Sequence, residues 1–241
     1  MRVLGIESSS LVASVALVTD DILTAEYTVD FKKTHSQTLL PMLDEIVKLL
    51  ELDMDTIDAI AVAGGPGSFT GLRIGAATAK GLGLALKKPL VHVPTVDAMA
   101  YNMWGAEGLI CPIMDAKRSQ VYTGLYHTGN GLEMRELAGL LNEKGERVIF
   151  LGDGVPVYED IIREMLTVPH AFAPAQMNRQ RAASVAALGM SAILDAEGCH
   201  GVQVVTAAEF TPDYLRKPQA ERQREAEQSA RGAAAKLPGD Y

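Results

Sequence analysis

Cysteine is scarce in this sequence, and its histidines are scattered. The 241 residues include two cysteines, Cys111 and Cys199, which lie far apart without a Cys-x-x-Cys spacing. This excludes a disulfide framework and a cysteine-based zinc site, and it predicts two buried thiols in a reducing compartment. None of the five histidines lies four residues from another or in a His-Glu-x-x-His pattern. A built-in zinc or iron site is therefore not expected.

Positive charge and long apolar runs are also lacking. The formal net charge is −8, and no basic stretch marks a face that could grip nucleic acid without help. No apolar run approaches the roughly 20 residues that cross a bilayer. The first residues turn acidic at Glu7, too early for a secretory signal. We therefore expect a soluble, cytoplasmic protein without membrane contact.

Apolar and small residues are abundant, and in the first half they follow a regular order. Three short apolar segments predict an antiparallel meander, with Asp20-Asp21 as the turn between its second and third strands. A helix, a strand, a second helix and a further strand follow, which predicts a mixed sheet with helices on its faces. This is the order of the ribonuclease H-like unit from which actin-like two-lobed ATPases are built. The expected strands are Val3–Ile6, Val12–Val18, Ile22–Phe31, Ile57–Ala63 and Leu90–Val93, and the helices are Gln37–Leu50, with Ser36 as its N-cap, and Leu72–Leu86.

The second half is less regular but repeats the mixture of strands and helices. Its expected strands are Leu109–Asp115, Gln120–Tyr126 and Val148–Leu151, and its helices are Thr95–Trp104, Glu136–Glu143, Pro156–Leu166 and Arg179–Ala196. We predict an α/β, actin-like fold of two lobes, each with a mixed sheet and flanking helices. The lobes are expected over 1–100 and 101–212, followed by a polar tail over 213–241 that is disordered from about Glu221.

A glycine-rich stretch, Gly64 to Gly75, joins the fourth expected strand to the second expected helix. Glycines at a helix N-terminus are typical of phosphate-binding loops, and Ser68 or Thr70 can cap the helix. A P-loop, however, needs a Lys after its last glycine, and here Leu72 and Arg73 follow Gly71. The stretch therefore favours a structural or partner-contact role over a phosphate cradle.

Small residues recur at every fourth position of the helix that follows, at Gly71, Gly75, Ala79 and Gly83. Positions i and i+4 share one face of a helix, so another backbone must pack closely there. The helix Gln37–Leu50 also carries more apolar residues than one buried face needs. Packing within the chain and a protein–protein interface both explain these two features.

Phosphoryl transfer is the most serious enzymatic alternative. The first strand of actin-like ATPases ends in Asp-Gly-Thr, whereas here Glu7-Ser8-Ser9 stands at that place. Asp115 and Asp153 follow strands and could act as a second acid or simply as turn residues. There is no Gly-x-Ser-x-Gly elbow to indicate a serine hydrolase. A stand-alone ATPase or small-molecule kinase stays the alternative function.

The glycine-rich stretch resembles the signature of the TsaB (YeaZ) family, bacterial proteins of tRNA threonylcarbamoyladenosine biosynthesis. The resemblance covers roughly residues 1–222 and is specific. Further matches are Ile6-Glu7-Ser8-Ser9, His35-Ser36-Gln37, Asp115-Ala116-Lys117-Arg118, Val121-Tyr122, Tyr214-Leu215-Arg216-Lys217 and Gln219-Ala220-Glu221-Arg222.

The resemblance implies a non-catalytic scaffold that binds the paralogous catalytic subunit TsaD. That subunit transfers the threonylcarbamoyl group to the adenosine beside the anticodon, and the ATPase TsaE joins the complex. tRNA would be reached only through the complex, and the chain alone would form a homodimer. The metal-binding His-Met-Glu-Gly-His stretch of the catalytic paralogue aligns with Thr95–Met99, so both histidines are lost. This loss also argues against the peptidase activity once assigned to the superfamily.

The resemblance places the pairing surface on the first two helices. Its expected residues are Leu39, Leu40, Leu43, Val47, Gly71, Leu72, Gly75, Ala76, Ala79 and Gly83. No intrinsic cofactor or metal is expected. ATP or ADP with magnesium is left open, in the cleft or at the partner interface, and the cleft candidates are Glu7, Ser8, Ser9, Gly65, Gly67 and Ser68.

Overall fold

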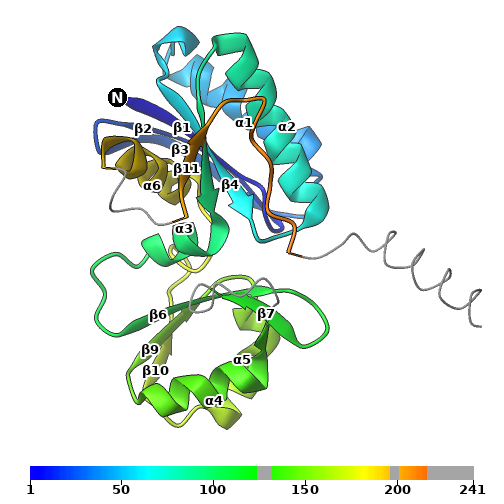
Figure 1. Cartoon of the computed structure of the whole chain (residues 1–241), viewed down its shortest axis with the longest axis vertical. Coiled ribbons are helices and arrows are strands. Elements are labelled where there is room, and N and C mark those ends of the chain that lie inside the picture. The colour runs from blue at the N-terminus through cyan, green and yellow to red at the C-terminus, as the bar shows by residue number, and fades with distance from the viewer. Residues whose placement is uncertain (124–131, 196–200, 216–241) are drawn as a thin grey trace, which may run out of the picture.

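Two sheets form the cores of two lobes in this computed structural model, which describes residues 1–123, 132–195 and 201–215 (Figure 1). The first sheet has the order β11-β5-β4-β1-β2-β3, and the second has the order β10-β9-β6-β7-β8. The strands are β1 (Arg2–Glu7), β2 (Val12–Thr19), β3 (Ile22–Asp30), β4 (Ala59–Gly65), β5 (Leu90–Pro94), β6 (Leu109–Asp115), β7 (Gln120–Thr123), β8 (Leu132–Glu133), β9 (Val148–Leu151), β10 (His170–Phe172) and β11 (Gln203–Val205). The helices are α1 (His35–Leu49), α2 (Phe69–Leu86), α3 (Thr95–Tyr101), α4 (Met134–Lys144), α5 (Val155–Met165) and α6 (Ala182–Leu194), with a 3-10 turn, η1, at Met54–Thr56.

The first sheet confirms the predicted meander and crossovers. β1 pairs antiparallel with β2 and parallel with β4, and β2 pairs antiparallel with β3. The turn between β2 and β3 is made by Asp20 and Asp21, which have φ values of 47° and 67°. β1, β2 and β4 are buried along nearly their whole length, because helices cover both faces of the sheet.

The helix layers of the first lobe differ from the prediction in one respect. α1 and α2 pack on one face of the sheet, as expected, around Leu4, Ile60 and Leu39. The opposite face is covered by α6, whose Val185 and Met190 pack on Val3 and Val91. The predicted second lobe over 101–212 is therefore wrong for α6 and β11, because both belong to the first lobe. The apolar sequence of a helix indicates that the helix is buried, but it does not indicate which sheet the helix packs on.

Several element ends also differ from the prediction. α1 begins at His35, with Thr34 rather than Ser36 at the N-cap and without a side-chain capping bond. α2 begins three residues early, at Phe69, because Ser68 caps it by accepting from the N–H of Gly71. α6 begins at Ala182 instead of Arg179. The expected disorder from Glu221 lies outside the described residues.

The second lobe is built on β6 and β9, which pair in parallel. α4 and α5 pack on one face of its sheet around Leu137, Phe150 and Ile162, while Val96 and Met99 of α3 pack on the other. Cys111 is a free buried thiol, as predicted, and burial raises the pKa of this thiol to about 12. β8 and β10 were not predicted, since strands of two or three residues carry too little pattern.

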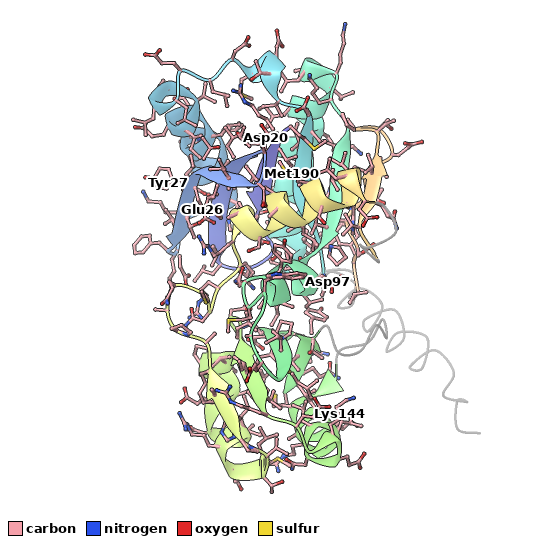
Figure 2. The ribbon with its side chains drawn as sticks, turned by 90° about the vertical axis from the view of Figure 1, so that its left-hand side faces the viewer. Asp20, Glu26, Tyr27, Asp97, Lys144 and Met190 are labelled. Atoms are coloured by element: carbon pink, nitrogen blue, oxygen red, sulfur yellow. The ribbon has the colours of Figure 1, made fainter. Side chains whose placement is uncertain are left out.

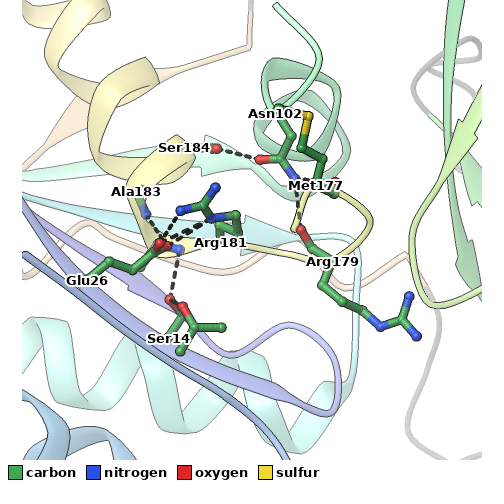
Figure 3. A network of polar contacts seen from close by, with 10 residues as sticks. Ser14, Glu26, Asn102, Met177, Arg179, Arg181, Ala183 and Ser184 are labelled. Carbon is green, nitrogen blue, oxygen red and sulfur yellow. Dashed lines mark hydrogen bonds and ion pairs between the residues drawn. The ribbon is translucent and has the colours of Figure 1, made fainter. Parts of the chain in front are cut away.

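The chain crosses twice between the lobes, and polar contacts tie the two crossings together (Figure 3). Asn102, just after α3, donates through Nδ2 to the carbonyl oxygens of Met177 and Arg179, at 3.0 and 2.8 Å. The hydroxyl of Ser184 donates to Asn102 Oδ1. On the other side, the Arg181 guanidinium forms a part-buried ion pair with Glu26 of β3. The second crossing is thus fixed to α3, to α6 and to the first sheet.

Removing the Asn102 side chain should loosen the junction between the lobes. Asn102→Ala leaves two backbone carbonyls without their donor, which we expect to lower the free energy of unfolding by about 2 kcal/mol. Hydrogen exchange should increase at residues 177–181. Asn142→Ala is the control, because Asn142 bonds to Met165 and Thr167 inside the second lobe. Unchanged exchange at 177–181 in Asn102→Ala would contradict the assignment.

Candidate functional site

The glycine-rich loop packs closely on the turn that follows β1. A Cβ atom on Gly71 would lie 2.1 Å from the carbonyl oxygen of Ser8, and one on Gly67 would lie 2.4 Å from that of Ser9. On Gly75 it would lie 2.2 Å from Ser8 Oγ. Real hydrogen bonds join the same segments, from the Ser8 hydroxyl to the Gly71 carbonyl at 2.9 Å and from the Ser68 N–H to the Ser9 carbonyl at 2.6 Å. The glycines are required because the chain itself fills the space above them.

The other end of the loop is covered by a segment from the far end of the described chain. This C-terminal strap, residues 206–215, runs along α2, and the N–H of Asp213 donates to the Gly64 carbonyl at 2.7 Å. Gly65, with φ of 124°, has room only for hydrogen because a Cβ there would lie 2.6 Å from the Asp213 carbonyl oxygen. The Tyr214 ring packs on Phe69 with centroids 4.8 Å apart. The first residues of the predicted polar tail are therefore part of the first lobe.

Sequence reasoning missed the strap because its contacts span more than 100 residues. Lys80 of α2 donates to the carbonyls of Ala208 and Phe210, and the Phe210 side chain is 1% exposed. His92 Nε2 lies 3.3 Å from Asp213 Oδ2. The one available signal was the pair of aromatic residues, Phe210 and Tyr214, in an otherwise polar region.

The predicted pairing residues are mostly buried within the chain. The α2 residues Gly71, Leu72, Gly75, Ala76, Ala79 and Gly83 are all buried. On α1, Leu39 and Leu43 are buried and Val47 is half-buried, whereas Leu40 is 53% exposed. As a partner surface the prediction is wrong for the buried residues, because they pack on the sheet and on the turn at Ser8. Of the alternatives for the small-residue stripe, packing within the chain is the one that the structure shows.

A second row of residues on α2 faces outward instead. Arg73, Ala77, Gly81 and Ala85 are exposed at four-residue spacing, and Leu84 beside them is 65% exposed. A Cβ on Gly81 would meet no atom within 4 Å. α1 lies beside α2 on the same face of the sheet and adds Leu40. We call the exposed residues Leu40, Arg73, Ala77, Gly81, Leu84 and Ala85 the helix-pair face.

The helix-pair face is smooth and weakly charged. Its α2 row has side chains no larger than a methyl group at three of four positions, so a second helix could approach closely. The one charged member, Arg73, lies over the Phe69 ring with its guanidinium carbon 5.3 Å from the ring centroid. Exposed apolar patches of this kind mark interaction sites.

The carboxylates between the lobes were the candidates for phosphoryl transfer. Glu7 is 1% exposed, and burial raises its pKa to about 7, although the Ser9 N–H donates to it at 2.6 Å. Burial likewise raises the pKa of Asp153, which accepts from Gln180 Nε2 at 3.0 Å. Burial opposes ionisation of Asp115 too, but the Lys117 ammonium and N–H beside it lower its pKa.

This arrangement does not fit a nucleotide phosphate at the predicted residues. The space beside Gly67 is filled by the Ser9 carbonyl, and the space beside Gly71 is filled by the Ser8 carbonyl. The Ser8 hydroxyl already donates to the Gly71 carbonyl. Gln180 Oε1 is buried without a partner and is open to a further hydrogen bond. Gly65 lies under the strap, and Ser68 is a helix cap. Within the described ranges, no three His, Cys, Asp or Glu side chains converge as metal ligands.

The similarity of the chain to known proteins identifies its family. Residues 29–224 match the family model TsaD, tRNA N6-adenosine threonylcarbamoyltransferase. The chain is 33% identical over 231 residues to the tRNA threonylcarbamoyladenosine biosynthesis protein TsaB of Bacillus subtilis, a match that covers 92% of this chain and 96% of that protein. The chain belongs to the TsaB family. The TsaB of Escherichia coli is 35% identical over 128 residues, which cover 52% of this chain and 55% of that protein.

Solved structures of TsaB-type proteins agree with the fold. YeaZ from Pseudomonas aeruginosa superposes with a TM-score of 0.70 at 25% identity, covering 88% of this chain and 99% of that one. The actin-like, two-lobed α/β architecture predicted from the sequence is thereby confirmed. As for membranes, none of the helices in the described part of this TsaB-family chain has the length and apolar character to cross one.

Proposed function

We propose that this chain is a non-catalytic scaffold subunit of the complex that places threonylcarbamoyl on N6 of the adenosine next to the anticodon in tRNA. The observation that carries the proposal is the helix-pair face, an exposed small-residue surface on a chain of the TsaB family. The names of its relatives place them in threonylcarbamoyladenosine biosynthesis. The buried, engaged carboxylates and serines support a scaffold rather than an enzyme that works alone.

The absence of the metal-binding histidines also supports a scaffold role for this chain, with catalysis by a partner subunit. Thr95 and Met99 stand where the resemblance places the metal-binding histidines of the catalytic paralogue, and both are buried, at 0% and 1% exposure. Met99 packs in the core between α3 and the second sheet. Neither side chain supplies an imidazole ligand, so the transfer chemistry falls to the partner.

The partner expected at the helix-pair face is the TsaD-type catalytic paralogue. Related chains of the same fold can pair through equivalent helices, since such a surface is self-complementary. By the same argument the chain alone forms a homodimer through this face. We further propose that a TsaE-type ATPase joins the complex, that tRNA is contacted only within it, and that the complex works in the cytoplasm.

A bulky charge in the middle of the helix-pair face tests this function. Ala77→Arg should weaken binding to the TsaD-type subunit at least tenfold and lower reconstituted tRNA modification in proportion. The free energy of unfolding should stay within about 0.5 kcal/mol, because Ala77 is exposed. Affinity is measured by calorimetry and self-association by light scattering.

The matched control is Val157→Arg. Val157 is 56% exposed on α5 of the second lobe, far from α2. This variant should bind and support modification like the unaltered chain. If Ala77→Arg bound the catalytic subunit with unchanged affinity, the helix-pair face would not be the pairing surface. If modification proceeded equally well without this chain, the scaffold function itself would be refuted.

A further inference from the structure

A groove of about 450 Å³ lies at the end of the first lobe that points away from the second lobe. Figure 2 shows this end, where Asp20 is labelled. The walls come from the start of β1, the β2–β3 hairpin and the segment after α1. The lining residues are Arg2, Leu17, Thr19, Asp20, Ile22, Thr24, Leu50, Glu51, Leu52 and Asp53. This hairpin groove is separate from the helix-pair face and from the carboxylates between the lobes.

The hairpin groove has an apolar floor and apolar edges. Leu17 is buried at its base, while Ile22 is 67% exposed and Leu50 is 37% exposed. Large apolar side chains that are exposed together in this way mark binding surfaces more often than isolated ones do.

The walls are held in place by hydrogen bonds, so the groove is formed before anything binds. The Arg2 guanidinium donates to Thr56 Oγ1 at 2.6 Å, and the backbone N–H of Arg2 donates to the Asp58 carboxylate. Asp53 caps η1 by accepting from the N–H of Asp55. The N–H of Asp20 donates to the Met1 carbonyl. A rigid groove loses little conformational entropy on binding, which favours affinity.

The rim of the hairpin groove is acidic. Three carboxylates, Asp20, Glu51 and Asp53, line the groove, and Asp21 adjoins it. They stand against two positive groups, the Arg2 guanidinium and the Met1 amino group, which pairs with Asp20. Glu51 is exposed, with no ion pair among the described residues. The phosphates of RNA would be repelled here, whereas a cationic partner would be attracted.

We propose that the hairpin groove binds a short segment of a partner protein in which leucine-like side chains are flanked by lysine or arginine. The apolar side chains would fill the space between Ile22 and Leu50, and the cations would face Glu51 and the hairpin aspartates. The helix-pair face stays free, so the chain can hold this partner and its paralogue at once.

A labelled peptide tests the proposal with the full chain. The probe is the synthetic peptide Lys-Leu-Leu-Lys-Arg-Leu-Leu-Lys, and its matched control carries Glu in place of each Lys and Arg. Fluorescence anisotropy should show saturable one-to-one binding of the basic peptide, at least tenfold tighter than the acidic one and weaker as salt increases. Equal binding of both peptides, or no saturation up to millimolar concentration, would overturn the proposal.

Substitutions in the hairpin groove test whether the peptide binds there. Ile22→Ser and Leu50→Ser should each weaken the basic peptide about tenfold, and Glu51→Lys should weaken it while flattening its salt dependence. The controls on the second lobe are Val157→Ser and Asp160→Lys, both at exposed positions, which should leave binding unchanged. Unaltered affinity in the three groove variants would place the peptide elsewhere and refute the groove. Circular dichroism confirms that each variant is folded.

Discussion

Gly71→Ala is expected to lower the free energy of unfolding by about 3 kcal/mol, the upper range for overpacking a buried site. The new methyl group would lie 2.1 Å from the Ser8 carbonyl oxygen and 3.2 Å from the His35 ring. The oxygen belongs to a backbone that is fixed on both sides, because Ser8 is 1% exposed and its hydroxyl is bonded to Gly71 itself. Neither partner can move away without breaking contacts. Urea unfolding followed by circular dichroism measures the loss.

Gly81→Ala on the same helix is the matched control, for which the expected change in the free energy of unfolding has the opposite sign. Gly81 is exposed, and a Cβ there meets nothing within 4 Å. Alanine in a helix interior is favoured over glycine by about 1 kcal/mol, so this variant should be more stable than the unaltered chain. A neutral Gly71→Ala would show that the turn at Ser8 is not packed as described.

The pair of glycines also shows where prediction from the sequence stops. α2 carries two rows of small residues at four-residue spacing, one through Gly71, Gly75 and Ala79, and one through Ala77, Gly81 and Ala85. Spacing identifies both rows as smooth helix faces but does not say which one faces the core. That is decided by the turn at Ser8, more than 60 residues away. The sequence therefore predicted a close-packing helix, but it assigned a partner contact to the row of small residues that is buried within the chain.

The fold was predictable where the signal is local. Alternating apolar segments and the Asp20-Asp21 turn sufficed for the β1–β3 meander, and Ser68 was one of the two candidate caps, with Thr70. The return of α6 to the first sheet and the strap over Gly64 depend on packing between distant segments. Glu7 was singled out by its place after the first strand, but its burial under that packing could not be read from neighbouring residues.

Glu7→Gln is expected to raise the free energy of unfolding at pH 8 by about 3 kcal/mol, because a shift of one pKa unit corresponds to about 1.4 kcal/mol. Burial raises the Glu7 pKa from 4.5 to about 7. Below pH 4.5 the folded and unfolded states both hold the proton. Between pH 4.5 and 7 the unfolded state releases it first, so stability falls as the pH rises; above 7 the penalty is constant.

Glutamine keeps the shape of the side chain and the acceptor for the Ser9 N–H, but it has no proton to release. The difference in stability between Glu7→Gln and the unaltered chain should therefore be small at pH 4.5, grow up to about pH 7 and then level off. Taking this difference cancels the titration of all other groups. Glu45→Gln, at an exposed position on α1, is the matched control for the loss of one formal charge. A flat difference for Glu7→Gln would mean that Glu7 is ionised in the folded chain, and that water or a cation reaches the space between the lobes.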